Sequence, residues 1–332
     1  MNNKSATHVG GPWFDELAQG QVFDDAPGVT LTDGLAAAHQ AILGDRLRLP
    51  MDHHLGASVT GNTAAVAHPA LVWDVAIGQS TLATHHVKAN LFYRGLTFGR
   101  FPHLGDTLYT RTEVVGLKDN TAKPGKSPTG LAALRVVTTD HDDRIVLDFH
   151  RCAMLALSPL ADPERTTRRD DLSTIGVHSD TAAALPQWNL AAFAERLGSS
   201  GAGRPEIGAV FTSSGDVVTS APELARVTLN VAAVHHDERV SGSRLVYGGH
   251  TIGLALAQAT RALPALVTVL SWQSCDHTGP VHEGDTLTSS LEVIDSQPAG
   301  SGVAADLRSI VHAHRDGAAH AVLDWRFTAL LA

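Results

Sequence analysis

The chain has 332 residues and a formal net charge of −9, with 25 lysines and arginines against 34 aspartates and glutamates. Its 43% hydrophobic and 18% charged residues predict a globular rather than a disordered protein. The length exceeds the roughly 100–200 residues of a single domain. An acidic balance without a basic cluster argues against partners that are nucleic acids or anionic membrane surfaces. We therefore expect a soluble protein of two domains.

The compartment is indicated by what the sequence lacks. Cys152 and Cys275 are too few for a disulfide framework or a four-thiolate zinc site, and they suit a reducing compartment. The opening stretch MNNKSATHVGGPWF has no apolar segment of the kind found in signal peptides. No run of about 18 apolar residues occurs either. These features predict a cytoplasmic protein with no membrane attachment.

Short segments recur in the same order in both halves of the chain. The pairs are LGDTL with EGDTL (104–108 and 283–287), VLDF with VLDW (146–149 and 322–325), and GQVF with GAVF (20–23 and 208–211). Such a pattern predicts two copies of one unit with loop insertions. Two copies are too few for a solenoid, so we expect tandem domains over 1–157 and 206–332. Residues 158–205 are predicted to form a linker with a short helix in 185–201.

Each copy has a predicted helix that is apolar on every face, at 69–77 in the first copy and 249–259 in the second. A helix of this kind has to be buried. In the second copy Ser220-Ala-Pro-Glu223 is typical of a capping box that opens an earlier helix. Four later segments have the β-branched content of strands: 266–272, 286–294, 304–314 and 320–331. A central helix wrapped by an antiparallel sheet is the hotdog arrangement, so the predicted class is α+β, as a double hotdog.

Two aligned segments hold the residues most suited to chemistry, GDRLRLPMD at 44–52 and LNVAAVHHD at 229–237. Both resemble G-D-x-N-P-L-H-x-D, the active-site segment of the MaoC-like hydratases and dehydratases. In that family the first Asp and the His that follows it form the acid/base pair. The GDTL segments and apolar helices extend this resemblance over nearly the whole chain. The resemblance implies a hydro-lyase that acts on (R)-3-hydroxyacyl thioesters.

The two copies diverge at the dyad positions. The first copy keeps Asp45, but Pro50 stands in the histidine position. The second copy keeps His235, with Asn230 in the aspartate position. His235 alone of these exchanges a proton near neutral pH without a large pKa shift, so the second copy is the predicted catalytic half. Asn230 would hold a water molecule or orient the imidazole, and Asp237 would support His235 or its loop.

Asparagine in the aspartate position also occurs in one branch of the family. That branch includes mesaconyl-C4-CoA hydratase-like proteins, whose motif resembles F-N-x-H-x-I-H-x-D. The second copy matches it at Asn230, His235 and Asp237, and departs from it at Leu229 and Ala232. Residues 90–120 of the first copy are more similar to the mesaconyl-CoA hydratase (β-methylmalyl-CoA dehydratase) group. The resemblance therefore implies a short branched or dicarboxylic acyl group, and it does not decide between these two groups of enzymes.

The start of the second buried helix is the other predicted element of the site. Backbone N–H groups near Gly248 and Gly249 would stabilise enolate charge on a thioester oxygen. Tyr247 and His250 flank these glycines and are predicted to contact substrate. At the equivalent point of the first copy, Pro69 has no N–H to donate. We therefore expect an acyl-binding first half beside a catalytic second half.

The resemblance implies reversible addition of water across an α,β-double bond, with no metal and no redox cofactor. Coenzyme A would be part of the substrate, with acyl carrier protein as the alternative carrier. The predicted catalytic residues are His235, Asn230 and Gly249, and the predicted substrate-binding residues are Asp237, Tyr247, Gly248 and His250. The protein is expected to be a homodimer, because hotdog sheets often pair again.

Two other functions remain open on the sequence alone. A thioesterase on this fold needs a carboxylate base beside the central helix, for which Asp74 is the one candidate. A degenerate hotdog that only binds acyl-CoA is the second, because the dyad is divided between Asp45 and His235. A metal site is not expected, since adjacent histidines point in different directions and no H-E-x-x-H or Cys-pair pattern occurs.

Overall fold

The computed structural model describes residues 9–122, 124–177, 181, 183–198 and 204–332. Its framework is a 12-stranded sheet in the order β1-β4-β5-β6-β3-β9-β12-β11-β10-β7, with β2 on β4 and β8 on β10. The long strands of the first half are β3 (Val87–Phe98), β4 (Thr107–Asp119), β5 (Thr129–Thr139) and β6 (Ile145–Ala156). Those of the second half are β9 (Leu266–His277), β10 (Thr286–Ala299), β11 (Gly302–Arg315) and β12 (Ala318–Leu331). The four strands predicted in the second copy are confirmed.

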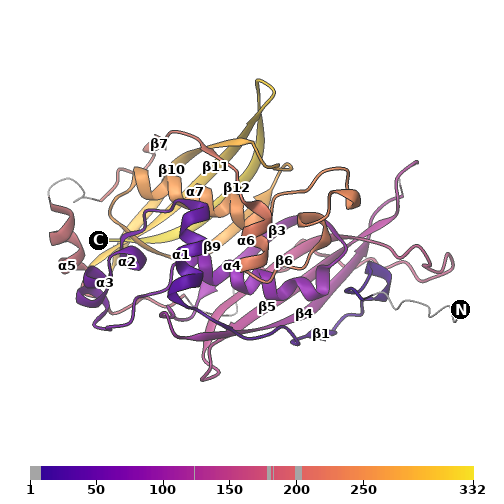
Figure 1. Ribbon diagram of the computed structural model, residues 1–332, viewed down its shortest axis with the longest axis horizontal. Helices are drawn as coiled ribbons and strands as arrows, with labels where there is room; N and C mark the ends of the chain where they lie inside the picture. The colour runs from indigo at the N-terminus through magenta and orange to yellow at the C-terminus, as the bar shows by residue number, and fades with distance from the viewer. Residues whose placement is uncertain (1–8, 123, 178–180, 182, 199–203) are drawn as a thin grey trace, which may run out of the picture.

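The short strands extend the edges of this sheet. They are β1 (Val22–Phe23), β2 (Val29–Thr30), β7 (Val210–Thr212) and β8 (Asp216–Val217). The two halves join where β3 pairs antiparallel with β9, with Tyr93 opposite Cys275. The junction makes one continuous sheet, and Figure 1 shows its two halves on either side of β3 and β9.

The duplication is visible in matched hydrogen bonds. In the first half the Gln79 amide donates to the Leu108 carbonyl at 3.1 Å and accepts from the Thr110 hydroxyl at 2.6 Å. In the second half Gln258 donates to the Leu287 carbonyl at 2.9 Å and accepts from the Ser289 hydroxyl at 2.6 Å. A buried amide satisfied in the same way in both halves ties each central helix to its own strand.

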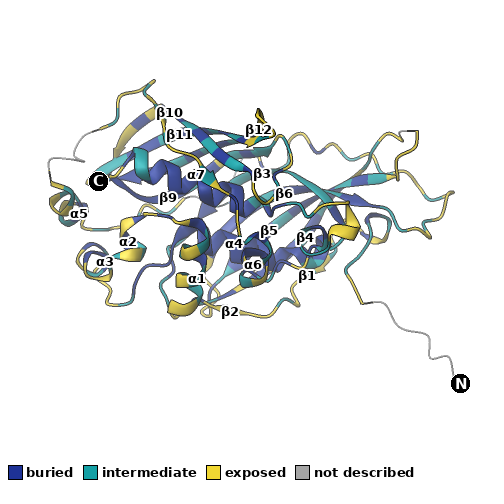
Figure 2. Cartoon of the chain, turned by 45° about the horizontal axis from the view of Figure 1, so that its top comes forward, coloured by how far each residue is buried: buried dark blue, intermediate teal, exposed yellow. Residues whose placement is uncertain are grey.

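Both central helices lie against the sheet, α4 (Pro69–Gln79) in the first half and α7 (Gly248–Ala262) in the second. Every residue of α4 is buried, and Figure 2 shows both helices as buried elements. Trp73 of α4 packs edge-on against Trp272 of β9, with 4.8 Å between ring centroids, and lies 6.1 Å from Trp325 of β12. Since a first-half helix packs on second-half strands, the two repeats share one hydrophobic core.

The remaining helices are shorter or partly exposed (Figure 2): α1 (Asp33–Leu43), α2 (Arg48–Met51), α3 (His53–Thr60), α5 (Leu190–Leu197) and α6 (Ala221–Val227). Single turns of 3₁₀ helix occur at η1 (Phe14–Glu16), η2 (Ser80–Thr84), η4 (Ala233–His235) and η5 (Glu238–Val240). The α5 helix lies inside the segment predicted as a linker. None of the described helices has both the length and the apolar character that crossing a bilayer requires.

The predicted capping box at α6 is wrong. Ser220 has a left-handed backbone with φ of 56°, and its side chain caps nothing. The carboxylate of Glu283, far along the chain, instead accepts from the Ala221 N–H at 3.1 Å. A capping side chain needs an extended backbone at its own residue, and Ser220 does not have one. The GDTL segments form turns that lead into strands β4 and β10, and Gly105 and Gly284 there have positive φ of 101° and 90°.

Candidate active site

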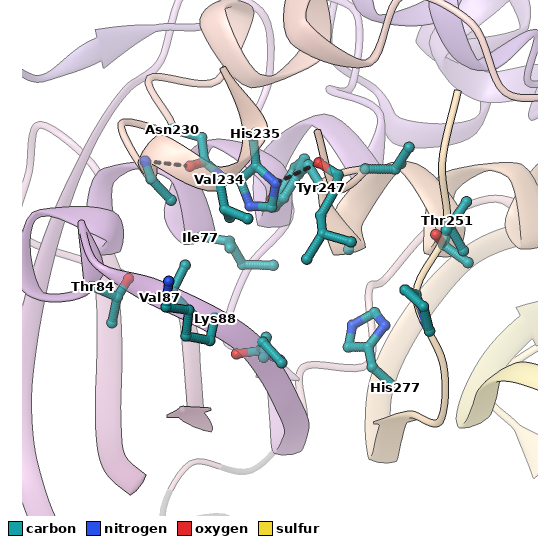
Figure 3. A pocket seen from close by; sticks show the side chains of 18 of the residues that line it. Ile77, Thr84, Val87, Lys88, Asn230, Val234, His235, Tyr247, Thr251 and His277 are labelled. Atoms are coloured by element: carbon teal, nitrogen blue, oxygen red, sulfur yellow. Dashed lines mark hydrogen bonds between the residues drawn. The ribbon is translucent and has the colours of Figure 1, made fainter. Parts of the chain in front are cut away.

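A cavity of about 290 Å³ lies where the two halves meet (Figure 3). One wall comes from the end of α4, η2, β3 and β6 of the first half, and the other from residues 230–251 and 277–281. Of the predicted site residues, the structure brings four together in this lining: Asn230, His235, Tyr247 and Gly248. Three others are outside the lining: Asp237, Gly249 and His250.

Asn230 and Asp45 occupy equivalent turns. Leu229 and Gly44, just before them, both have left-handed backbones, with φ of 60° and 62°. The Asn230 side-chain oxygen accepts from the Ala232 N–H at 3.0 Å, while Asp45 makes the same bond to the Leu47 N–H at 2.5 Å. Since its oxygen is engaged in the turn, the Asn230 amide nitrogen is the group left for a ligand or water in the cavity.

The first-half helix makes room for the Asn230 turn. A Cβ on Gly78 of α4 would stand only 1.7 Å from the Thr228 carbonyl oxygen. The Val231 N–H donates at 3.0 Å to the hydroxyl of Thr81, just past α4. Glycine at 78 therefore allows the second-half loop to pack directly on the end of α4.

His235 is held with one ring nitrogen engaged. Its Nδ1 lies 2.9 Å from the Leu245 carbonyl oxygen, and its ring packs edge-on against Tyr247 at 5.8 Å. A carbonyl only accepts hydrogen bonds, so Nδ1 bears the proton and Nε2 is the basic nitrogen. Desolvation lowers the pKa of His235 to about 4, outweighing the opposing effect of the Leu245 hydrogen bond. The imidazole is therefore neutral at pH 7 and suited to accept a proton.

The first turn of α7 has free donors beside the cavity. Tyr247 precedes the helix without a side-chain cap. Within the described chain, no acceptor is bonded to the N–H groups of Gly248 or Gly249. Unpaired N–H groups at a helix N-terminus favour developing negative charge. This matches the predicted oxyanion element, with Gly248 as the residue that lines the cavity.

His277, at the end of β9, is a lining residue that the sequence analysis missed. A Cβ on Gly248 would lie 2.7 Å from His277 Nε2, so this imidazole sits directly against the start of α7. Its Nε2 has no hydrogen-bond partner within the described chain, and burial lowers its pKa to about 4. No spacing motif marks His277, because strand pairing alone brings the end of β9 to this helix.

The three predicted residues outside the lining have other surroundings. Gly249 faces α4, where a Cβ would stand 2.0 Å from an Asp74 carboxylate oxygen. His250 is fully buried, both of its ring nitrogens are without partners among the described residues, and burial lowers its pKa to about 4. Asp237 caps η5 by accepting from the Arg239 N–H at 3.0 Å and forms an ion pair with its side chain. It therefore holds the loop after His235.

The equivalent point of the first half is closed. His68 precedes α4, and its Nδ1 accepts from the Ala70 N–H at 3.0 Å. Its Nε2 lies 3.1 Å from the buried carboxylate of Asp45. Pro69 has no N–H, so the first turn of α4 has fewer donors to offer a ligand than that of α7.

Asp74, the candidate thioesterase base, is fully buried in α4 and is outside the cavity lining. Its carboxylate accepts from the Tyr247 hydroxyl at 3.1 Å and lies 3.0 Å from His39 Nε2. Desolvation raises the pKa of this carboxyl, and the hydrogen bond with His39 opposes the shift. Asp74 thus supports the start of α7 from behind.

No model of a protein family matches the chain. The chain is 29% identical over 298 residues to β-methylmalyl-CoA dehydratase of Chloroflexus aurantiacus, covering 86% of this chain and 82% of that protein. It is 25% identical over 314 residues to mesaconyl-CoA hydratase of Cereibacter sphaeroides, with coverages of 89% and 87%. Thus two enzymes named for acyl-CoA hydration or dehydration align with most of its length.

Two solved structures share the whole fold. A conserved hypothetical protein of Mycobacterium tuberculosis, described as a double hotdog, has a TM-score of 0.94 and 60% identity, over 98% of this chain and all of that one. A protein of Chloroflexus aurantiacus described as a MaoC domain protein has a TM-score of 0.82 and 25% identity, with coverages of 98% and 99%. The chain belongs to the MaoC-like double hotdog proteins. The predicted fold class and the predicted resemblance are both confirmed.

Proposed function

We propose that this protein is a hydro-lyase that reversibly adds water to an α,β-unsaturated acyl-CoA thioester. One observation carries the proposal: a neutral His235, with Nε2 as its basic nitrogen, shares a cavity with Gly248, whose N–H at the start of α7 is free within the described chain. The reaction needs a base that takes a proton from water and N–H donors that stabilise the enolate oxygen. The names of the two aligned relatives support the same chemistry.

In the hydration direction, the thioester oxygen accepts from Gly248 at the start of α7. His235 Nε2 takes a proton from a water molecule that the Asn230 amide also holds. The hydroxide adds to Cβ, and the π electrons move onto the thioester oxygen as an enolate, which the helix N-terminus stabilises. The proton on His235 then passes to Cα. Both parts of the water end on the substrate, so the reaction balances without a metal or a redox cofactor.

The two halves divide the work in this proposal. The first half supplies to the cavity wall the apolar side chains of Ile77 and Val87, which suit an acyl chain, beside polar side chains that include Arg151. The second half supplies His235 and Asn230. In the described part of the first half, the equivalent position is filled by Asp45 and His68, with 3.1 Å between a carboxylate oxygen and Nε2. We therefore propose 1–157 as the acyl-binding domain and 206–332 as the catalytic domain.

A thioesterase would need a carboxylate that reaches the thioester carbon or its attacking water. Asp74 is held by Tyr247 and His39 behind the cavity lining. This arrangement favours hydration over thioester hydrolysis.

The test is to follow loss of the enoyl-thioester absorbance of crotonyl-CoA and mesaconyl-CoA with the wild type, His235→Ala and the exposed-site control His320→Ala. We expect loss with the wild type and the control but not with His235→Ala. Release of free CoA thiol would instead identify a thioesterase. Binding of both thioesters without either change would identify an acyl-CoA-binding protein.

We also propose that the protein acts in the cytoplasm as a homodimer. Both cysteines are buried free thiols, which suits a reducing compartment. Light scattering coupled to gel filtration tests the dimer, since a monomer mass at micromolar concentration would contradict it.

A further inference from the structure

Arg151 of β6 is a buried guanidinium on the cavity wall. It is 3% exposed, lines the cavity, and lies opposite Tyr93 in the pairing of β3 with β6. The Thr84 hydroxyl and the Tyr93 phenol are its hydrogen-bond partners. Its Nε has no partner within the described part of the chain.

No carboxylate neutralises this charge in the described chain. Arg151 takes part in none of its ion pairs, and the ionisable groups that act most strongly on it are Tyr93, Tyr247 and Cys152. Burial lowers the pKa of Arg151, but a guanidinium stays protonated at neutral pH. Phenols and thiols are neutral there, so the positive charge has no counter-ion. A buried charge of this kind is costly unless a partner arrives.

Other arginines of the same sheet are paired. Arg135 binds Asp148 through two nitrogens, and Arg308 binds Asp324 in the same way. Arg315 at the second GDTL turn is paired with Asp285. Arg151 differs from these three in lacking an aspartate and in facing a cavity.

We propose that Arg151 is the residue that selects a dicarboxylic over a monocarboxylic acyl group, by binding the carboxylate at the far end of the acyl chain in this cavity. The inference rests on the proposed function, because it places the substrate in the same cavity. Arg151 comes from the first half and His235 from the second, so a bound acyl group is anchored on one half while it reacts on the other. The cavity volume of about 290 Å³ suits a short chain. A guanidinium with a free Nε is suited to a forked bond with a carboxylate.

The same contact would tune the base. The charged and titratable groups around the His235 side of the cavity are Lys88, Tyr93, Arg151, Tyr247 and His277, with His236 next in the chain. Burial is the main cause that lowers the pKa of His235, and the positive charge of Arg151 lowers it further. A substrate carboxylate on Arg151 cancels the effect of that charge. The pKa of His235 is then higher with a dicarboxylic substrate bound than with a monocarboxylic one.

Binding of unreactive analogues tests the inference without chemistry. Succinyl-CoA and butyryl-CoA differ by a carboxylate in place of a methyl group. By calorimetry we expect the wild type to bind succinyl-CoA on the order of 100-fold more tightly. Arg151→Met should abolish the preference, and Arg151→Lys should restore part of it. The control Lys88→Met removes another cation from the same lining and should keep the preference. Equal binding by the wild type, or loss of the preference in Lys88→Met but not in Arg151→Met, would overturn the inference.

The second part of the test compares the turnover of fumaryl-CoA with that of crotonyl-CoA. Arg151→Met should lower kcat/KM for fumaryl-CoA on the order of 100-fold and change that for crotonyl-CoA by much less. The pKa seen in the kcat profile should be higher with fumaryl-CoA. If the wild type prefers succinyl-CoA but hydrates neither enoyl thioester, the inference holds and the proposed hydratase fails. If it hydrates both equally and Arg151→Met changes nothing, the hydratase holds and the inference fails.

Discussion

The hydroxyl of Tyr247 donates a hydrogen bond to the carboxylate of Asp74, 3.1 Å away, across the boundary between the two repeats. Asp74 belongs to the central helix of the first half, and Tyr247 is the residue from which the central helix of the second half begins. The ring of Tyr247 also packs edge-on against His235. One side chain therefore connects the core of the first half to the proposed base.

Removing this hydroxyl should affect both stability and rate. Tyr247→Phe leaves one oxygen of a fully buried carboxylate without its donor, which costs about 1–3 kcal/mol of unfolding free energy. Urea denaturation measures this loss. The exposed control Tyr109→Phe should change stability by less than about 0.5 kcal/mol. Equal stability of the two variants would show that the Asp74 contact contributes nothing.

The pH dependence of hydration should reflect a neutral His235. Its pKa is lowered to about 4, so the free enzyme holds the base in its active form at every pH well above that value. We expect kcat/KM for crotonyl-CoA to stay flat between pH 5 and pH 8. A stopped-flow pH profile checks this. A rise centred near pH 6.5, the ordinary value for histidine, would mean that the cavity leaves His235 solvated.

Stability should fall on acidification because of buried neutral histidines. Burial lowers the pKa of His250 to about 4, from 6.5 for an exposed histidine. Between pH 6.5 and pH 4 the imidazole is protonated in the unfolded chain but neutral in the folded one. The stability that the neutral His250 contributes is therefore complete above pH 6.5 and is lost as the pH falls towards 4. His277 contributes with the same sign.

His250→Leu isolates one of these contributions. The substitution removes two ring nitrogens that have no partners within the described chain, so stability at pH 7 should not decrease. The loss of stability between pH 6.5 and pH 4.5 should become smaller than in the wild type. Denaturation midpoints at the two pH values measure it, with His320→Leu at an exposed position as the control. An unchanged pH dependence would contradict burial of a neutral His250.

Glycine at position 248 should be essential for the rate and less so for the fold. A Cβ there would come within 2.7 Å of the His277 ring, at the point where the thioester oxygen is proposed to bind. Alanine keeps the backbone N–H, but its methyl group would displace His277 or the bound thioester, so Gly248→Ala should lower kcat/KM on the order of 100-fold, as much as loss of an oxyanion contact does. Gly34→Ala in α1 is the matched control, because its Cβ meets no atom closer than 3.9 Å. It should keep full activity and gain about 0.5–1 kcal/mol of stability.

Features set by local pattern were predictable from the sequence. The two central helices are mostly apolar, the four second-copy strands are rich in β-branched residues, and the GDTL turns have glycine at a positive φ. The repeat alignment also led to Asn230 and His235, because a motif five residues apart lies within one loop. Each of these depends only on residues close together along the chain.

Features set by long-range contact were decided by the tertiary structure. Arg151 and His277 are ordinary strand residues until the pairing of β3 with β6 and β9 brings them to one cavity. Ser220 does not cap α6, because Glu283 from a distant turn takes that role. Local periodicity determines which face of an element is buried, but not which distant element it meets. Local pattern thus predicts the repeats and the proposed base, while the joining of two repeats into one sheet places the residues that surround that base.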